Sequence, residues 1–209
     1  MKIASHLFAA ACAAMAFVSP ARAHPHVWVS VTSEVVYDAK GAATGVKHAW
    51  KFDDMYSAFA LEGLTQKTKS VFTREELAGL AEVNITTLKE SDFFTFAKAA
   101  GKDVAFGDAS DYWIDYKDET LTLNFTLPFK APLQAKNLSV EIYDPSYFVD
   151  FGFAEKDPVR LVGAPAQCKA TVEKPKGMSF AQGKQLSESS FTDGNWGQNF
   201  ASTIAVTCP

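Results

Sequence analysis

The stretch HVWVSVTSEVVYDAKGAATGVKHAWKFDD, residues 26–54, contains two alternating apolar runs separated by turn residues. In the first run, Val27, Val29, Val31 and Val35 fall on alternate positions and therefore share one face of an extended strand. The second run repeats this spacing with Val46, Trp50 and Phe52. Between the runs, DAKGAATG (38–45) has the composition of a turn. The stretch therefore predicts a β-hairpin with one apolar face.

The register of this hairpin decides which polar side chains meet. With the turn centred near residue 41, the numbers of facing residues sum to about 82 or 83, and the register of about 83 gathers the apolar residues on one face. That register puts His48 opposite Val35, and it leaves His24, His26 and Asp53 on the other face. We expect His48 to be a core histidine that hydrogen-bonds the backbone, unless a neighbouring strand brings it to a metal site.

The remainder of the chain predicts helices followed by strands. Residues 55–64 and 73–94 have helical spacing, and the second segment opens with a Thr73–Glu76 capping box. Strand patterns return from residue 102. The prediction is a mostly β (α+β) fold: an antiparallel, β-sandwich-like sheet with a helical insertion near 55–100.

The N-terminus has the pattern of a secretory signal peptide. Lys2 precedes the apolar run LFAAACAAMAFV (7–18), and Ala-Arg-Ala ends at Ala23. The run is shorter than the roughly 18–20 residues that span a bilayer, so no stable membrane insertion is expected. We predict a leader of residues 1–23, cleavage after Ala23, and a single periplasmic domain of residues 24–209.

The charge balance disfavours polyanionic partners. The chain has 20 basic and 24 acidic residues. Removing Lys2 and Arg22 with the leader leaves 18 basic residues, a formal charge of 18 − 24 = −6. This argues against nucleic acid or an anionic membrane as the main partner, and it suits a protein that meets cations.

Two cysteines remain after cleavage, Cys168 and Cys208. In an oxidising compartment a lone pair most simply forms one disulfide, which here ties the C-terminal end to the domain. A thiolate metal site or a redox site is the alternative, but the CxxC spacing typical of such sites is absent.

Cleavage after Ala23 makes His24 the first residue, with an α-amine and an imidazole on one residue. Together with His26 and a carboxylate such as Asp53, these donors suit zinc, copper or nickel. Pro25 has no N–H, which excludes an amino-terminal chelate through deprotonated amides. A histidine brace remains open, and so does a solvated chain end without metal.

Asp144 and Asp150 in EIYDPSYFVDF (141–151) are further candidate ligands. Asp144 also precedes a proline, a pair that commonly forms a turn.

Several segments occur in one order that closely resembles a family of bacterial periplasmic proteins known only as a domain of unknown function. They are HPHVWV at 24–29, HAWKFDDMYSA (48–58), TREELAGLAEVN (73–84), LTLNFTLPF (121–129), EIYDPSYFVDF, CKATVEKP and the terminal AVTC. The family is described as the periplasmic component of an uncharacterised, ABC-type transport system. Its members accompany NicO-type nickel/cobalt permeases, and in Zev-type systems the pair serves zinc uptake. The resemblance implies an inner-membrane metal permease as partner.

One departure from that family concerns calcium. Members often carry an acidic D-x-D-G-D-G loop before the REEL helix, similar to half an EF-hand. The corresponding ligand positions here are Thr65, Lys67 and Lys69, and Ser70 replaces the glycine. Because a calcium loop needs oxygen ligands at these places, no calcium binding is expected.

We therefore expect a non-enzymatic metal-binding accessory protein that delivers zinc, or nickel or cobalt, to the permease. G-x-S-x-G and HExxH motifs are absent from the sequence, so it offers no hydrolase signature. The alternatives are a copper protein of histidine-brace type with oxidative activity and a metal-free structural or assembly factor. The candidate metal ligands are His24, His26, His48, Asp53 and Asp144.

Overall fold

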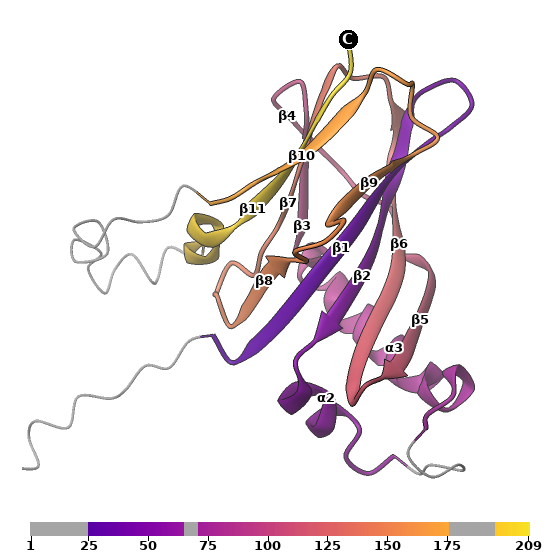
Figure 1. Cartoon of the computed structure of the whole chain (residues 1–209), viewed down its shortest axis with the longest axis vertical. Coiled ribbons are helices and arrows are strands. Elements are labelled where there is room, and N and C mark those ends of the chain that lie inside the picture. Colours follow the sequence, from indigo (N-terminus) through magenta and orange to yellow (C-terminus); the bar gives the residue numbers. More distant parts are fainter. Residues whose placement is uncertain (1–24, 65–70, 176–194) are drawn as a thin grey trace, which may run out of the picture.

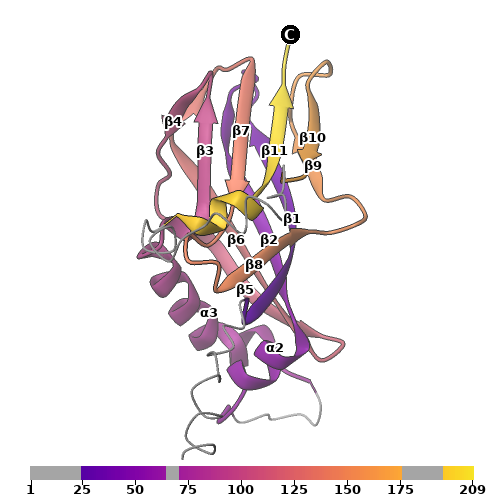
Figure 2. The same cartoon turned by 90° about the vertical axis from the view of Figure 1, so that its left-hand side faces the viewer.

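The computed structural model describes residues 25–64, 71–175 and 195–209, which form a two-layered, mostly β fold (Figure 1). Figure 2 shows the five-stranded sheet in front of the six-stranded one, with helices α2 and α3 below it. The expected leader and the residues compared with a calcium loop lie outside the described ranges. Among the described helices, none combines the length and apolar character needed to cross a membrane.

The six-stranded sheet has the order β5-β6-β2-β1-β8, and β9 also pairs with β1. Its strands are β1 Val27–Tyr37, β2 Ala43–Phe52, β5 Ser110–Lys117, β6 Thr120–Leu133, β8 Val149–Phe153 and β9 Val159–Val162. Strands β8 and β9 run parallel to β1, one after the other along its length, and the other pairs are antiparallel. The sheet is therefore mixed rather than purely antiparallel.

The five-stranded sheet has the order β10-β11-β7-β3-β4 and is antiparallel throughout. Its strands are β3 Thr95–Ala99, β4 Lys102–Val104, β7 Asn137–Ile142, β10 Lys169–Glu173 and β11 Ser202–Thr207. Strand β3 lies within the segment that the sequence assigned to the helical insertion. The insertion is therefore shorter than predicted.

The helices are α2 Asp54–Ala60, α3 Arg74–Lys89 and the 3-10 turns η1 Asp92–Phe94 and η3 Trp196–Phe200. The predicted capping box is confirmed: Thr73 Oγ1 accepts from the Glu76 N–H, and the Glu76 carboxylate accepts from the Thr73 N–H. These reciprocal bonds satisfy backbone donors that the first turn leaves without helical partners.

The inner face of the six-stranded sheet is buried in two halves. Toward the hairpin turn it packs against the other sheet, where Val35 and Val46 share a cluster with Val140 and Ile204. Toward the start of β1 it packs against α3, with Trp50, Leu123 and Ile114 in one cluster with Leu77, Ala81 and Ile85. The predicted apolar face of the hairpin is therefore the core face.

The predicted register of the hairpin is wrong by two residues. Val31 faces Trp50, and His48 faces Ser33 rather than Val35. The turn is shorter than the predicted range 38–45, because β2 already begins at Ala43. Within it, the Asp38 carboxylate accepts from the backbone N–H groups of Lys40 and Ala42. A shift of two residues keeps every side chain on its predicted face, so the inward and outward assignments survive.

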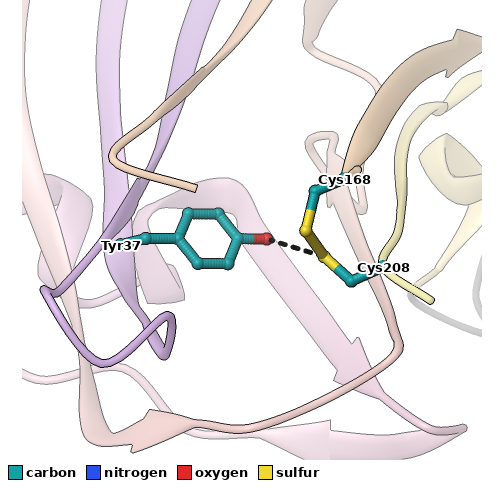
Figure 3. Close-up of a disulfide and its surroundings, with 3 residues drawn as sticks. All are labelled: Tyr37, Cys168 and Cys208. Atoms are coloured by element: carbon teal, nitrogen blue, oxygen red, sulfur yellow. Dashed lines mark hydrogen bonds between the residues drawn. A yellow bond between two sulfur atoms is a disulfide. The ribbon is translucent and has the colours of Figure 1, made fainter. Parts of the chain in front are cut away.

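A disulfide joins Cys168 to Cys208, as predicted, with Cα atoms 4.2 Å apart (Figure 3). It links the segment before β10 to the residue after β11. The Tyr37 hydroxyl donates to Cys208 Sγ across 4.0 Å, and burial raises the pKa of Tyr37. The crosslink thus contacts the end of β1 in the opposite sheet.

Candidate functional site

The first described residues of the chain are fixed at the start of β1. The His26 N–H donates to the Phe148 carbonyl across 2.8 Å, and the two rings lie 4.8 Å apart between centroids. His26 remains exposed to solvent. Its imidazole is thus held on an ordered strand end, while His24 lies outside the described residues.

Asp144 builds the loop that carries Phe148. Its Oδ1 accepts from the N–H and the hydroxyl of Ser146, each at 2.8 Å, and its Oδ2 accepts from the N–H groups of Phe148 and Val149, each at 3.0 Å. Asp144 is only 5% exposed. Its carboxylate is therefore engaged by four donors of its own loop, an arrangement that supports the turn expected at Asp144-Pro145.

Asp144→Ala should loosen the contact between this loop and β1. Loss of the charged acceptor removes the shared partner of three partly buried backbone N–H groups, which is expected to lower the free energy of unfolding by about 2 kcal/mol. Urea unfolding and amide exchange at Phe148 and Val149 measure the effect. Asp150→Asn is the control, because the loop N–H groups donate to the Asp144 carboxylate and not to that of Asp150. Unchanged exchange in Asp144→Ala would contradict the assignment.

Asp53 connects β1 to α2. Its Oδ2 accepts from the Trp28 N–H and its Oδ1 from the Tyr56 N–H, both at 2.8 Å. The second bond caps the N-terminus of α2. Asp53 therefore lies at the same end of the sheet as His26, and both of its oxygens already accept backbone donors.

Asp150 is the second carboxylate beside the start of β1. It faces Trp28 in the parallel pair of β1 and β8, on the outward face where Trp28 is exposed. Burial raises the pKa of its carboxyl group. Within the described ranges it makes no hydrogen bond or ion pair. A hollow of about 580 Å³ lies here, lined among others by Trp28, Asp53, Asp54 and Asp150.

His48 lies inside the core, and burial lowers its pKa to about 3. Its Nδ1 is 2.9 Å from Ser33 Oγ and its Nε2 is 3.5 Å from Thr95 Oγ1. The aromatic rings of Trp50 and Phe125 pack against it. His48 is thus a core histidine, as expected. Its hydrogen-bonding partners are side-chain hydroxyls, however, and not the backbone groups that the sequence analysis predicted.

The structure brings some of the candidate ligands together and separates others. His26, Asp53 and the Asp144 loop meet at the start of β1, whereas His48 faces Ser33, seven residues and about 23 Å along that strand from His26. In the ranges that the structure describes, no three His, Cys, Asp or Glu side chains are grouped closely enough to hold a metal ion.

The sequence analysis named Asp150 as a candidate ligand but did not include it in the final set, and it did not place this residue beside the start of β1. Its place beside Trp28 depends on the parallel pairing of β1 with β8, which joins residues more than a hundred positions apart. The only signal for it in the sequence was its membership of EIYDPSYFVDF.

Two comparisons relate this chain to known proteins. A family model described as "Protein of unknown function (DUF1007)" matches residues 9–208. A protein of Haemophilus influenzae described as "Uncharacterized protein" is 23% identical over 194 residues, which cover 89% of this chain and 91% of that protein.

Proposed function

Because this chain belongs to the DUF1007 family, whose function is unknown, we propose a function from its own residues: a periplasmic, non-enzymatic accessory protein that binds zinc, or nickel or cobalt, and delivers it to an inner-membrane permease.

The observation that carries the proposal is the convergence of three segments distant in sequence. The segments PHVW (25–28), FDD (52–54) and DPSYFVDF (144–151) meet at the start of β1 through two backbone-anchored contacts, His26 with Phe148 and Trp28 with Asp53. Asp144 and Asp53 supply the bonds that fix this end, which leaves His26 and Asp150 directed outward. The fold thus rigidifies a strand end whose outward side chains include an imidazole and a carboxylate.

The chemistry of these donors suits a borderline transition metal. Zinc, nickel and cobalt accept imidazole nitrogen and carboxylate oxygen, and a carrier needs an open coordination position from which the metal can leave. Asp150 follows Phe148 by two residues, and the Phe148 ring lies 4.8 Å from the His26 ring between centroids, so the imidazole and the carboxylate belong to the same end of the sheet. His24, two residues upstream, would add an imidazole and, after cleavage, the α-amine.

The delivery step rests on the resemblance of these segments to periplasmic components of metal transport systems and on the net acidic charge. It predicts less zinc uptake, at limiting external zinc, in cells that carry His26→Ala with the permease than in cells that carry the unaltered protein.

Zinc binding is tested by competition titration of residues 24–209 against a chromophoric chelator. His26→Ala should weaken binding by more than the roughly 10–100-fold typical of changes around a metal ligand, because a ligand itself is lost. Asp150→Asn should also weaken binding. Affinity should fall at acidic pH, because a protonated imidazole cannot coordinate.

Asp103→Asn, an exposed carboxylate on β4 of the other sheet, is the matched control and should leave the affinity unchanged. Equal affinity in His26→Ala and the unaltered protein would refute the site. Loss of affinity only in His48→Ala would move the site to the core.

A further inference from the structure

A second hollow, of about 540 Å³, lies on the outward face of the six-stranded sheet, further along β1 from its start. Its volume falls in the range of about 300–1,000 Å³ that small-molecule sites occupy. The floor comes from outward positions of the three central strands, with the short Ala49 between Thr32 and Asn124 in the pairing register. Lys47 and Thr126 continue the floor in the next row.

Irregular backbone forms both rims of this hollow. Asp111 lies at the register shift between β5 and β6, and Asp157 lies in the segment between β8 and β9; each has φ of 47°. Such values are uncommon outside glycine, although aspartate tolerates them better than most residues. Bulges and strained residues often redirect side chains beside binding sites. Here two such residues, at opposite edges of one sheet, line the same hollow.

The charged side chains around the hollow are of both signs, three cationic and three anionic: Lys47, Lys156, Arg160, Glu34, Asp111 and Asp157. Arg160 and Glu34 form an ion pair with each other. The other four make no hydrogen bond or ion pair with any residue in the described part of the chain. The hollow therefore offers both a cationic and an anionic group to a ligand.

The spacing of these groups selects the size of the ligand. Lys47 on β2 and Asp111 on β5 are separated by β6, two strand spacings or about 10 Å between backbones. An extended tripeptide has about the same length, whereas a single amino acid is about a third as long. We propose that this hollow binds short, unmodified peptides of about three residues, with the carboxylate toward Lys47 and the ammonium group toward Asp111.

The neutral polar side chains of the floor fit the middle of such a ligand. The Thr32 and Thr126 hydroxyls can donate to peptide carbonyls and accept from peptide N–H groups. Asn124 can accept through its Oδ1, because its Nδ2 already donates to the Asp115 carboxylate and the Thr122 carbonyl. This site is separate from the start of β1, so it stands or falls independently of zinc binding.

Calorimetric titration of the protein with trialanine tests the proposal. Trialanine should bind, and alanine alone should bind at least about 10-fold more weakly because it cannot reach both charged groups. N-acetyl-trialanine and trialanine amide each lack one charge, so each should also bind about 10-fold more weakly, the scale of one charge-assisted hydrogen bond. Added salt should weaken binding, because these groups are exposed.

Lys47→Gln should weaken trialanine binding about 10-fold, and so should Asp111→Asn, in which asparagine keeps the backbone conformation. Lys51→Gln is the matched control: Lys51 is also exposed and outward on β2, but it does not line this hollow. The proposal is overturned by an absence of trialanine binding at millimolar concentration, by equal affinity in Lys47→Gln and Lys51→Gln, or by acetylated trialanine binding as well as the free peptide.

Discussion

Acidification from pH 7 to pH 4 is expected to lower the free energy of unfolding by about 3 kcal/mol through His48 alone. Burial lowers the pKa of this imidazole from 6.5 to about 3 in the folded protein. Between these two values the unfolded chain binds a proton that the folded chain does not. The contribution of His48 is therefore fully present above about pH 6.5 and is lost as the pH falls toward 3. Since domains are stable by only about 5–15 kcal/mol, the effect is large.

Urea unfolding at pH 7 and pH 4 isolates this contribution when His48→Gln is compared with the unaltered protein. Glutamine keeps a polar partner for Ser33 and does not titrate. The variant should be less stable at pH 7, but it should lose about 3 kcal/mol less on acidification, because carboxylates contribute equally to both proteins. His26→Gln, at an exposed position, should behave like the unaltered protein. Parallel losses in His48→Gln and the unaltered protein would contradict the buried, neutral state of His48.

Reduction of the disulfide should lower the free energy of unfolding by about 3–4 kcal/mol. The bond closes a loop with a sequence separation of 40 residues, and opening it returns that chain entropy to the unfolded state. The described part of the loop is anchored by β10 and β11, so the folded sheet should survive reduction under native conditions.

Alkylation and unfolding experiments check this prediction. Residues 24–209 contain no cysteine other than Cys168 and Cys208, so the folded, oxidised protein should show no reactive thiol until a reductant is added. The double variant Cys168→Ser, Cys208→Ser should match the reduced protein in urea unfolding and should not respond to reductant. Labelling of the untreated protein, or equal stability with and without reductant, would show that the crosslink does not form or does not stabilise the fold.

The sequence predicted well those features that depend on local pattern. The alternation in residues 26–54 assigned the core face of the hairpin correctly, and Thr73 with Glu76 marked the start of α3. The register failed because it depends on where the turn closes. That closure is determined by the Asp38 carboxylate and by the β-bulge between Val36 and Tyr37, which alternation does not encode.

Features that depend on contacts between distant segments could not be predicted. Thr95, a hydrogen-bonding partner of His48, begins a strand that the sequence assigned to the helical insertion. The place of Asp150 beside Trp28 requires the parallel pairing of β1 with β8. The sequence motifs therefore identified candidate ligands but did not show which of them lie together.

The position of β1 in the sheet has a consequence for the speed of folding. Its antiparallel partner β2 lies close in sequence, with Val29 paired to Phe52, whereas on its other side Val27 pairs with Val149, a separation of 149 − 27 = 122 residues. The chain must lose loop-closure entropy before contacts between such distant strands can stabilise it. We therefore expect folding in the millisecond-to-second range that is typical of β-sandwiches. Before β8 and β9 pair with it, β1 has an unpaired edge rich in β-branched residues. Another chain can pair with such an edge, which leads to aggregation. A chain truncated before residue 149 should therefore aggregate rather than fold.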